Sequence, residues 1–411
     1  MRCSAAMSAP RRSRMFASLE ERNVRIFFVG LGISNIGTWA QTTAVVFLVT
    51  RLGGEGRELG LAVASQFLPV LLIGLQAGTV ADRLDRHRLT LFTQTGMALQ
   101  AIALGAIDLT GVATIPMVYA MTALYGTLAA FDIPARRSFA TELVPKELLA
   151  NVLSLSTSVM TGARIFGPAL AAFVATEWGT AWVFFGNGAS FMAIIVGLLS
   201  IDRRRLHRVP PAPRTATPIR DGLRAVWTNP ALRTLTIALT LVATFSFNHL
   251  VYLPLLLRDQ LLASERSFGF MLTAMGIGNV FGALLVARLV TVPLVWFYVP
   301  SLVLGLCLST LAVTGELALA FVIAVPMGMA MTALMSASGV ILQQRSDPAL
   351  RGRLMALTTV ILIGSTPIGG PITGVIADGA GVLWATLYGG GVAILAAAAG
   401  GWLSWHHFQR S

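Results

Sequence analysis

The feature that most constrains the fold of this chain is a series of twelve apolar runs, each about 20 residues long. A bilayer hydrocarbon core about 30 Å thick is crossed by roughly 20 helical residues, so each run is long enough to span it. The spans must be helical, because unpaired backbone groups in lipid are costly and the alternation typical of a barrel is absent. The sequence therefore predicts an all-α integral membrane protein with 12 transmembrane helices. The runs cover residues 26–49, 59–80, 89–109, 113–131, 148–174, 182–201, 232–257, 268–289, 292–313, 317–342, 354–377 and 382–403.

The composition agrees with a chain that lies mostly in lipid. Hydrophobic residues make up 55% of it and charged residues 12%, and the mean hydropathy is +0.75. A soluble domain carries roughly 25% charged residues, so a soluble multidomain enzyme is excluded. The net charge of +12 comes from short arginine clusters between apolar runs, a pattern typical of membrane topology rather than nucleic-acid binding. Cys3 and Cys307 lack metal-ligand spacing, so we expect no metal site, cofactor or disulfide.

The arginine residues also predict the orientation in the membrane. When the connections are assigned alternately to two sides, 25 of the 30 basic residues fall on one side and 4 on the other, and Arg164 lies within a span. Because basic residues are enriched in cytoplasmic loops, both termini are expected in the cytoplasm. No removable signal peptide is expected. Residues 1–14 read as an over-extended start or as an anchor for anionic lipid.

The chain divides into two halves of six spans each. We predict a basic tail at 1–23, a first six-helix bundle at 24–201, a cytoplasmic linker at 202–231, a second bundle at 232–404 and a C-terminal tail at 405–411. The segment VPKELLANVLSL at 144–155 resembles DPALRGRLMAL at 347–357, and the pairs Pro145/Pro348 and Pro168/Pro371 share one offset. This repetition favours an internal duplication with a substrate path between the halves.

The connection after the second run carries the most informative motif. GTVADRLDRHRLTL at 78–91 resembles the loop motif of the major facilitator superfamily, with Gly78, Asp82, Arg83 and Arg86 in register and departures at Asp85 and His87. The segment 131–155 resembles the signature of the bacterial exporter branch that includes enterobactin exporters and multidrug or macrolide efflux proteins. The resemblance implies the major facilitator fold, with two six-helix bundles related by a pseudo-repeat. It also implies a secondary active transporter rather than an enzyme.

The same resemblance implies a function and its partners. We expect proton-driven efflux of a small amphipathic molecule, such as a drug, an antibiotic or a siderophore, by alternating access. The partners are then the small-molecule substrate, a coupling proton and the lipid bilayer, with no nucleic acid, and the chain is expected to act as a monomer. Import of a nutrient or metabolite, and a transport-inactive membrane sensor, are the alternatives.

The motif residues are expected to form a conformational latch rather than a substrate site. Gly78 lets two helices approach closely, and the resemblance implies that Asp82 bridges the two halves at the start of the eleventh span. It further implies that Arg83 or Arg86 pairs with an acid at the end of the fourth span. Asp132 is the candidate for that acid.

Several polar residues inside the spans are candidates for substrate binding or coupling. Arg164 lies midway along the fifth span, where a charge costs from about 2.5 to over 10 kcal/mol, so it is expected to face a cavity or a partner. It is either an anchor for an anionic substrate or a packing charge. His249 is either a proton carrier or a neutral side chain bonded to a neighbour such as Asn248. Asn35 and Gln41 line a polar path or hold helices together.

Two further features bear on mechanism. Many members of the exporter branch carry an acid in the first span, where this chain has Thr38, and the sequence offers no other acid at mid-depth. The fifth and eleventh spans are rich in small residues and proline, which are expected to form close helix contacts and a gate or hinge. The gate or hinge candidates are Gly162, Gly167, Pro168, Gly370 and Pro371.

Overall fold

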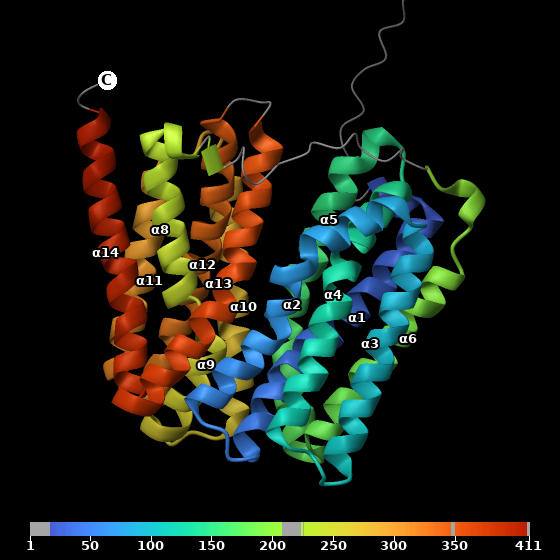
Figure 1. Ribbon diagram of the computed structural model, residues 1–411, viewed down its shortest axis with the longest axis horizontal. Coiled ribbons are helices and arrows are strands. Elements are labelled where there is room, and N and C mark those ends of the chain that lie inside the picture. Colours follow the sequence, from blue (N-terminus) through green and yellow to red (C-terminus); the bar gives the residue numbers. More distant parts are fainter. Residues whose placement is uncertain (1–16, 208–222, 225, 347–349, 409–411) are drawn as a thin grey trace, which may run out of the picture.

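A computed structural model describes residues 17–207, 223–224, 226–346 and 350–408 of the chain (Figure 1). Within these ranges the regular structure is helical, with no strand. The predicted tails at 1–16 and 409–411, most of the predicted linker, and Pro348 of the repeat lie outside the described residues. The long helices are α1 (Arg22–Arg51), α2 (Gly56–Arg83), α3 (Arg86–Leu109), α4 (Ile115–Glu142), α5 (Leu149–Trp178), α6 (Thr180–Leu199), α8 (Pro230–Ser246), α10 (Glu265–Ala287), α11 (Val295–Val313), α12 (Leu317–Gln344), α13 (Arg351–Ala380) and α14 (Val382–Phe408).

The shorter elements are 3₁₀ turns and the pieces that follow α8. They are η1 (Ala17–Glu20), η2 (Lys146–Leu148), η3 (Arg203–Arg205), α9 (His249–Leu255) and the π-helical turn η4 (Leu256–Gln260). Among the described residues, ten helical segments are long and apolar enough to cross a membrane. Helices α1 and α4 are not in that set, although they contain 30 and 28 residues. The count of twelve spans is compatible with these helices and stays a prediction.

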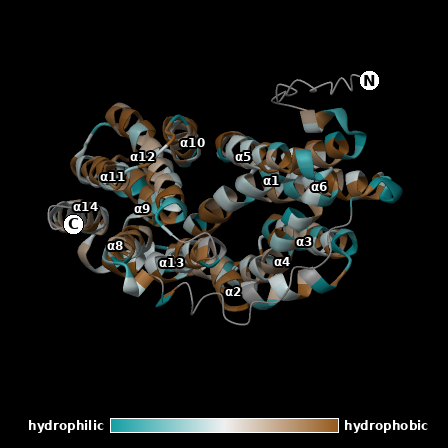
Figure 2. Ribbon diagram, turned by 90° about the horizontal axis from the view of Figure 1, so that it is seen from above, coloured by the Kyte–Doolittle hydropathy of each residue, from teal (hydrophilic) through white to brown (hydrophobic). Residues whose placement is uncertain are grey.

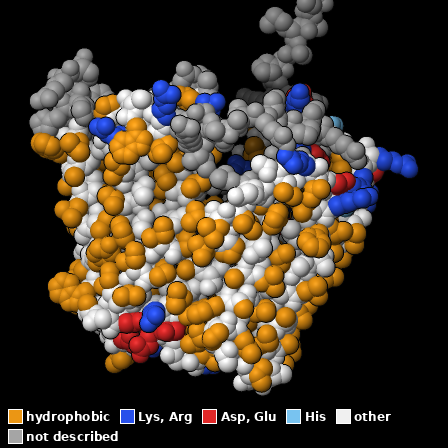
Figure 3. Space-filling view, in the orientation of Figure 1, with side chains coloured by type: hydrophobic (Ala, Val, Ile, Leu, Met, Phe, Trp, Pro, Cys, Tyr) orange, Lys and Arg blue, Asp and Glu red, His pale blue; other side chains and the backbone are white. Residues whose placement is uncertain are grey.

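The helices gather into two groups that stand side by side (Figures 1 and 2). Helices α1–α6 form one group, in which α1 and α3 pack on α6 and α2 packs on α4; α8–α14 form the other, in which α10 and α11 pack on α12. We call the end at which α1 begins and α14 ends the tail end. On the face drawn in Figure 3, hydrophobic side chains cover the middle, and Lys and Arg side chains lie mainly at the tail end.

Two expected helix boundaries are wrong, and each error has a physical reason. The fourth run was expected to end at residue 131, but α4 continues to Glu142 because the charged side chains beyond that point find partners inside the protein. The seventh run was expected to be one helix, but it breaks between Ser246 and His249. At the break, Gly369 of α13 lies against the Thr244 carbonyl, and Asn248 donates its amide to that carbonyl at 2.7 Å.

Candidate functional site

Arg164 lies on α5 against an aromatic ring of α1. Its guanidinium carbon is 5.0 Å from the centre of the Trp39 ring, a cation–π distance. The helices are close enough for this contact because Gly167 has no side chain: a Cβ there would lie 2.5 Å from the Trp39 Cβ. The Arg164 Nε is buried without a hydrogen-bond partner, and within the described residues Arg164 forms no ion pair. The ring therefore contacts the cation without satisfying its donors.

His249 begins α9, immediately after the helix break. Its Nδ1 lies 3.0 Å from the Phe247 carbonyl oxygen, so the predicted hydrogen bond to Asn248 is wrong. The Asn248 amide is already used, because it donates to the Thr244 carbonyl and, at 2.9 Å, to the Thr373 hydroxyl of α13. Helix α9 packs against α1 and α2 of the other group, and His249 is within electrostatic range of Arg164. The break thus brings an imidazole from one group toward the guanidinium of the other.

The two polar candidates on α1, Gln41 and Asn35, form different contacts. Gln41 donates to the Gln100 carbonyl oxygen at 3.1 Å and accepts from the Asn187 amide at 2.8 Å, which ties α1 to α3 and α6. These bonds support the interpretation that Gln41 holds helices together. Asn35 accepts a hydrogen bond from Arg136 of α4 at 3.2 Å. It therefore belongs to a charged network rather than to a simple helix contact.

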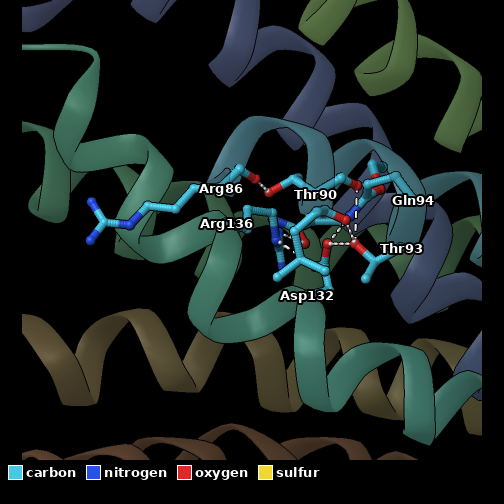
Figure 4. Close-up of polar contacts among 9 residues, drawn as sticks. Arg86, Thr90, Thr93, Gln94, Asp132 and Arg136 are labelled. Carbon is cyan, nitrogen blue, oxygen red and sulfur yellow. Dashed lines mark hydrogen bonds and ion pairs between the residues drawn. The ribbon is translucent and has the colours of Figure 1, made fainter. Parts of the chain in front are cut away.

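Asp132 is the centre of that network (Figure 4). One carboxylate oxygen accepts hydrogen bonds from the Thr93 hydroxyl at 2.9 Å and from the Gln94 amide at 2.8 Å, both on α3. The other oxygen lies 2.9 Å from the Nε of Arg136, one turn further along α4. The Asp132 residue is only 1% exposed. A buried carboxylate of this kind requires such partners, because an unpaired charge away from water is strongly unfavourable.

The predicted latch pairing with Asp132 is wrong. Arg86 forms its ion pair with Glu142, the last residue of α4, at 2.6 Å, while Asp132 pairs with Arg136. The motif did indicate an acid at the end of the fourth helix, but that acid is ten residues beyond the chosen one. Arg83 is exposed and forms no ion pair with a described residue.

The structure tests the expected contact of only one of the other two motif residues, Gly78. A Cβ at Gly78 would meet no atom within 4 Å, so no helix approaches closely there. The backbone of Asp82 lies in α2, and its side chain lies outside the described part of the chain. Both residues are near the tail end, where α2 stands apart from the second group.

The two groups meet along two helix pairs. Helix α2 contacts α13, and α5 contacts α10. In the first pair, a Cβ at Gly60 would lie 2.5 Å from the Gly370 carbonyl and 2.9 Å from the Cα of Pro371. In the second, Pro168 presents its carbonyl to Gly269, and Gly167 contacts α1. Gly167 and Gly370 thus lie at close helix contacts, whereas a Cβ at Gly162 would meet nothing within 4 Å, so the close contact expected there is absent from this structure. The gate or hinge role of these residues stays a prediction.

The helix contacts are concentrated at one end. Gly56 and Gly60, at the start of α2, touch α13, whereas Gly78 and Gly162, toward the tail end of α2 and α5, meet nothing. The helices of the two groups therefore lie closest together at the end opposite the tails and diverge toward the tail end (Figure 1). The Arg164 backbone lies at the contact between α5 and α10, because a Cβ at Gly276 would be 3.1 Å from the Arg164 carbonyl oxygen.

Two further acids near helix ends, Asp378 and Asp108, have partners on other helices. Asp378, near the end of α13, accepts hydrogen bonds from the Gly56 and Arg57 backbone amides at 2.7 and 2.9 Å. It therefore caps α2 across the boundary between the two groups. Asp108 is buried, pairs with Arg51 and accepts from the Thr180 hydroxyl at 2.5 Å. Sequence alone offered no signal for either partner, because each lies on a different helix.

Comparison with known proteins places these observations in a family. Residues 13–405 match the family described as transmembrane secretion effector. The multidrug efflux pump Tap of Mycobacterium tuberculosis is 27% identical over 84% of this chain and 85% of that protein. The staphyloferrin A transporter of Staphylococcus aureus is 20% identical over 87% of this chain and 90% of that protein. The uncharacterized MFS-type transporter YfiS of Bacillus subtilis is 27% identical, and the chain spans about half its length, 48%.

Solved structures share the fold at low sequence identity. The POT family transporter PepTSo superposes with a TM-score of 0.77 at 11% identity, over 95% of this chain and 99% of that one. A bacterial homolog of the human lysosomal transporter Spinster, in an inward-facing and occupied conformation, gives a TM-score of 0.72 at 15% identity, over 95% and 97%. In the described ranges no group of three or more His, Cys, Asp or Glu residues is placed to hold a metal ion.

Proposed function

Because this chain belongs to the transmembrane secretion effector family of the major facilitator superfamily, and is thus a multi-pass membrane transporter rather than an enzyme, we propose that it is a proton-driven exporter of a small amphipathic molecule. The proposal places it in a bacterial inner membrane with both termini in the cytoplasm and lets it act as a monomer. The tail end then faces the cytoplasm. The structure corresponds to the inward-facing state of an alternating-access cycle.

The observation that carries the proposal is the unsatisfied guanidinium of Arg164. Its Nε is buried without a partner, its ring contact with Trp39 leaves that donor free, and its backbone lies at the contact between α5 and α10. A cation held in a low-dielectric site without a carboxylate favours a ligand that brings an acceptor group. We propose that Arg164 binds a carboxylate or another acidic group of the substrate and that Trp39 packs against its apolar part.

Two considerations support export over import. The matching family is described by secretion, and the relative covering most of the chain at 27% identity is an efflux pump. A cytoplasmic opening that leads to Arg164 would let an amphipathic molecule enter from the cytoplasm or from the inner leaflet. Export of such molecules requires only that the opposite end open after loading.

An accumulation screen in an efflux-deficient bacterium tests the proposal. The probes are ciprofloxacin, which carries a carboxylate, and ethidium, a permanent cation. The wild type is expected to lower ciprofloxacin accumulation until an uncoupler is added, and Arg164→Ala is expected to abolish this effect at unchanged protein level, because the acceptor group loses its donor. Arg266→Ala is the matched control, since Arg266 also lies over aromatic rings but is paired with Glu177 and more exposed.

The outcomes separate the candidate functions. Equal loss in both arginine variants would contradict a specific role for Arg164. Higher accumulation in the presence of the wild type would indicate import. Unchanged accumulation of both probes, with the protein present in the membrane, would contradict export of this class of molecule.

A further inference from the structure

The described residues hold two buried carboxylates, Asp108 and Asp132, and they differ in depth. Asp108 is the residue before the end of α3, and its partner Arg51 is 49% exposed. Asp132 is deep in the first group of helices: α4 begins at Ile115 and ends at Glu142. At 1.5 Å per residue, the carboxylate is about 25 Å from one end of α4 and about 15 Å from the other. A buried acid that is away from both helix ends is therefore present on α4.

A chain of contacts leads from this carboxylate to the Arg164 site. Arg136 pairs with Asp132 and also donates to Asn35 on α1. Asn35 and Trp39 are four residues apart and share one face of α1, and the Trp39 ring contacts the Arg164 guanidinium. The Arg136 side chain is 17% exposed, so the network is not sealed from water as Asp132 is. The Asp132 network and the substrate-binding candidate Arg164 thus contact the same face of α1, through Asn35 and Trp39.

The surroundings of Asp132 make its charge depend on one cation. Helix α3 contributes two neutral donors, Thr93 and Gln94, and α4 contributes Arg136 and, within electrostatic range, Tyr125. Within the described residues, no hydrogen bond or ion pair to Asp132 comes from α1, α2 or α5. A buried carboxylate that loses its only cation is favoured in the neutral, protonated form. Binding of a proton and departure of Arg136 are therefore alternatives at this site.

We infer that Asp132 is the group that binds the coupled proton, in exchange for Arg136; this rests on the proposed proton-driven export. In the structure the carboxylate holds Arg136, which corresponds to the proton-released, inward-facing carrier that is ready for substrate. After the opposite end opens and substrate leaves, a proton from outside binds the Asp132 carboxylate and breaks its bond to the Arg136 Nε. The emptied carrier returns, and the proton passes to the cytoplasm when Arg136 pairs again.

The position of Asp132 also accounts for the missing first-span acid. Thr38 of α1, the residue that stands where the exporter branch often carries an acid, is near Tyr125 of α4, which is within electrostatic range of Asp132 and Arg136. The carboxylate is thus supplied from α4 to the same neighbourhood. A chain without an acid on α1 can still bind a proton there.

Infrared difference spectroscopy of the purified full-length protein, between alkaline and acidic buffer and without substrate, tests the inference directly. A protonated carboxyl band is expected in the wild type at acidic pH and is expected to be lost in Asp132→Asn. Asp108→Asn is the matched control, because it removes the other buried carboxylate, and it is expected to keep the band. Arg136→Gln is expected to show the band even in alkaline buffer, a signature that a purely structural ion pair would not give.

A transport assay in proteoliposomes separates this inference from the proposed function. With ciprofloxacin as probe, Asp132→Asn is expected to lose accumulation driven by a pH gradient while keeping exchange of labelled for unlabelled probe. If the pH gradient drives accumulation of the probe equally by the wild type and by Asp132→Asn, the inference is overturned and the proposed function stands. If the wild type shows neither a protonation band nor gradient-driven transport, both are overturned. If Asp132→Asn loses both gradient-driven transport and exchange but keeps the carboxyl band, the pair of Asp132 and Arg136 is structural. That result overturns the inference and leaves the proposed function standing.

Discussion

The two helix pairs that join the halves are built differently, although each places the end of one long helix against the start of another. Along α2 and α13, glycines lie on both helices: a Cβ at Gly60 would be 2.5 Å from the Gly370 carbonyl, and one at Gly374 would be 2.5 Å from the Gly56 carbonyl carbon. Along α5 and α10, the close-packed glycine is Gly269 on α10. By Gly276 the nearest atoms of α5 are 3.0 to 3.1 Å from an added Cβ.

The two pairs also end in different electrostatic contacts. Asp378 of α13 accepts two backbone amides at the start of α2, whereas Glu177 of α5 faces Arg266 of α10 at 3.7 Å, with both side chains well exposed. Backbone contacts and a capped helix start permit little variation in geometry, while an exposed ion pair permits much. The difference suggests that the α2–α13 pair sets the closed state and that the α5–α10 pair, which carries Arg164, accommodates movement.

The largest effect on this comparison is expected from Gly374→Ala. The added Cβ would meet backbone atoms of Gly56, which cannot move aside alone, and overpacking of this kind typically costs about 1–3 kcal/mol. The closed end should therefore open, seen as a longer distance between spin labels at Leu61 and Val375. Gly379→Ala on the same helix is the control, because its Cβ would meet nothing within 4 Å. Equal distances in both variants would contradict a tightly packed α2–α13 pair.

Asp378→Asn is expected to have an intermediate effect. The carboxylate is exposed, and a charge at a helix start contributes about 0.3–1 kcal/mol. Loss of that charge should increase the fraction of molecules in which the distance between the labels at Leu61 and Val375 is long. This increase should be smaller at high salt. A change as large as that of Gly374→Ala would mean that the charge, rather than the packing, holds the end closed.

The smallest effect is expected from Glu177→Gln. Exposed ion pairs contribute about 0–1 kcal/mol, and the Glu177 and Arg266 side chains are 47% and 39% exposed. The label distance and the transport rate should both match those of the wild type. If Glu177→Gln opens the end as far as Asp378→Asn does, the two pairs are equivalent and the contrast between them is lost.

The sequence predicts features that depend on neighbouring residues better than features that depend on contacts between distant parts of the chain. Apolar runs report the helices well, because burial in lipid acts on each segment separately. They misplace the end of α4, because Asp132, Arg136 and Glu142 are charged yet internally paired, and hydropathy counts only the charge. That error led to Asp132 rather than Glu142 as the partner of Arg86. It also hid a buried acid in what looked like a helix end.

The candidate site shows the same limit. A lone arginine within a span predicts a functional or packing charge, and Arg164 could be found in that way. Its aromatic partner Trp39 could not, because the two residues are distant in sequence and meet only through the absent side chain of Gly167. The Asp378 cap and the break before His249 likewise depend on contacts between helices far apart in sequence.

The central claim is that the empty carrier moves between its inward-facing and outward-facing forms only when a proton on Asp132 replaces Arg136. Double electron–electron resonance on protein with Cys3 and Cys307 replaced, and with one label pair at Leu61 and Val375 and another at Val80 and Thr359, measures both ends. In alkaline buffer the account predicts a short first distance and a long second one. At acidic pH the wild type is expected to gain a second population in which the first distance is long and the second short, whereas the distances in Asp132→Asn are not expected to respond to pH. Distances that respond to pH equally in both proteins would contradict it.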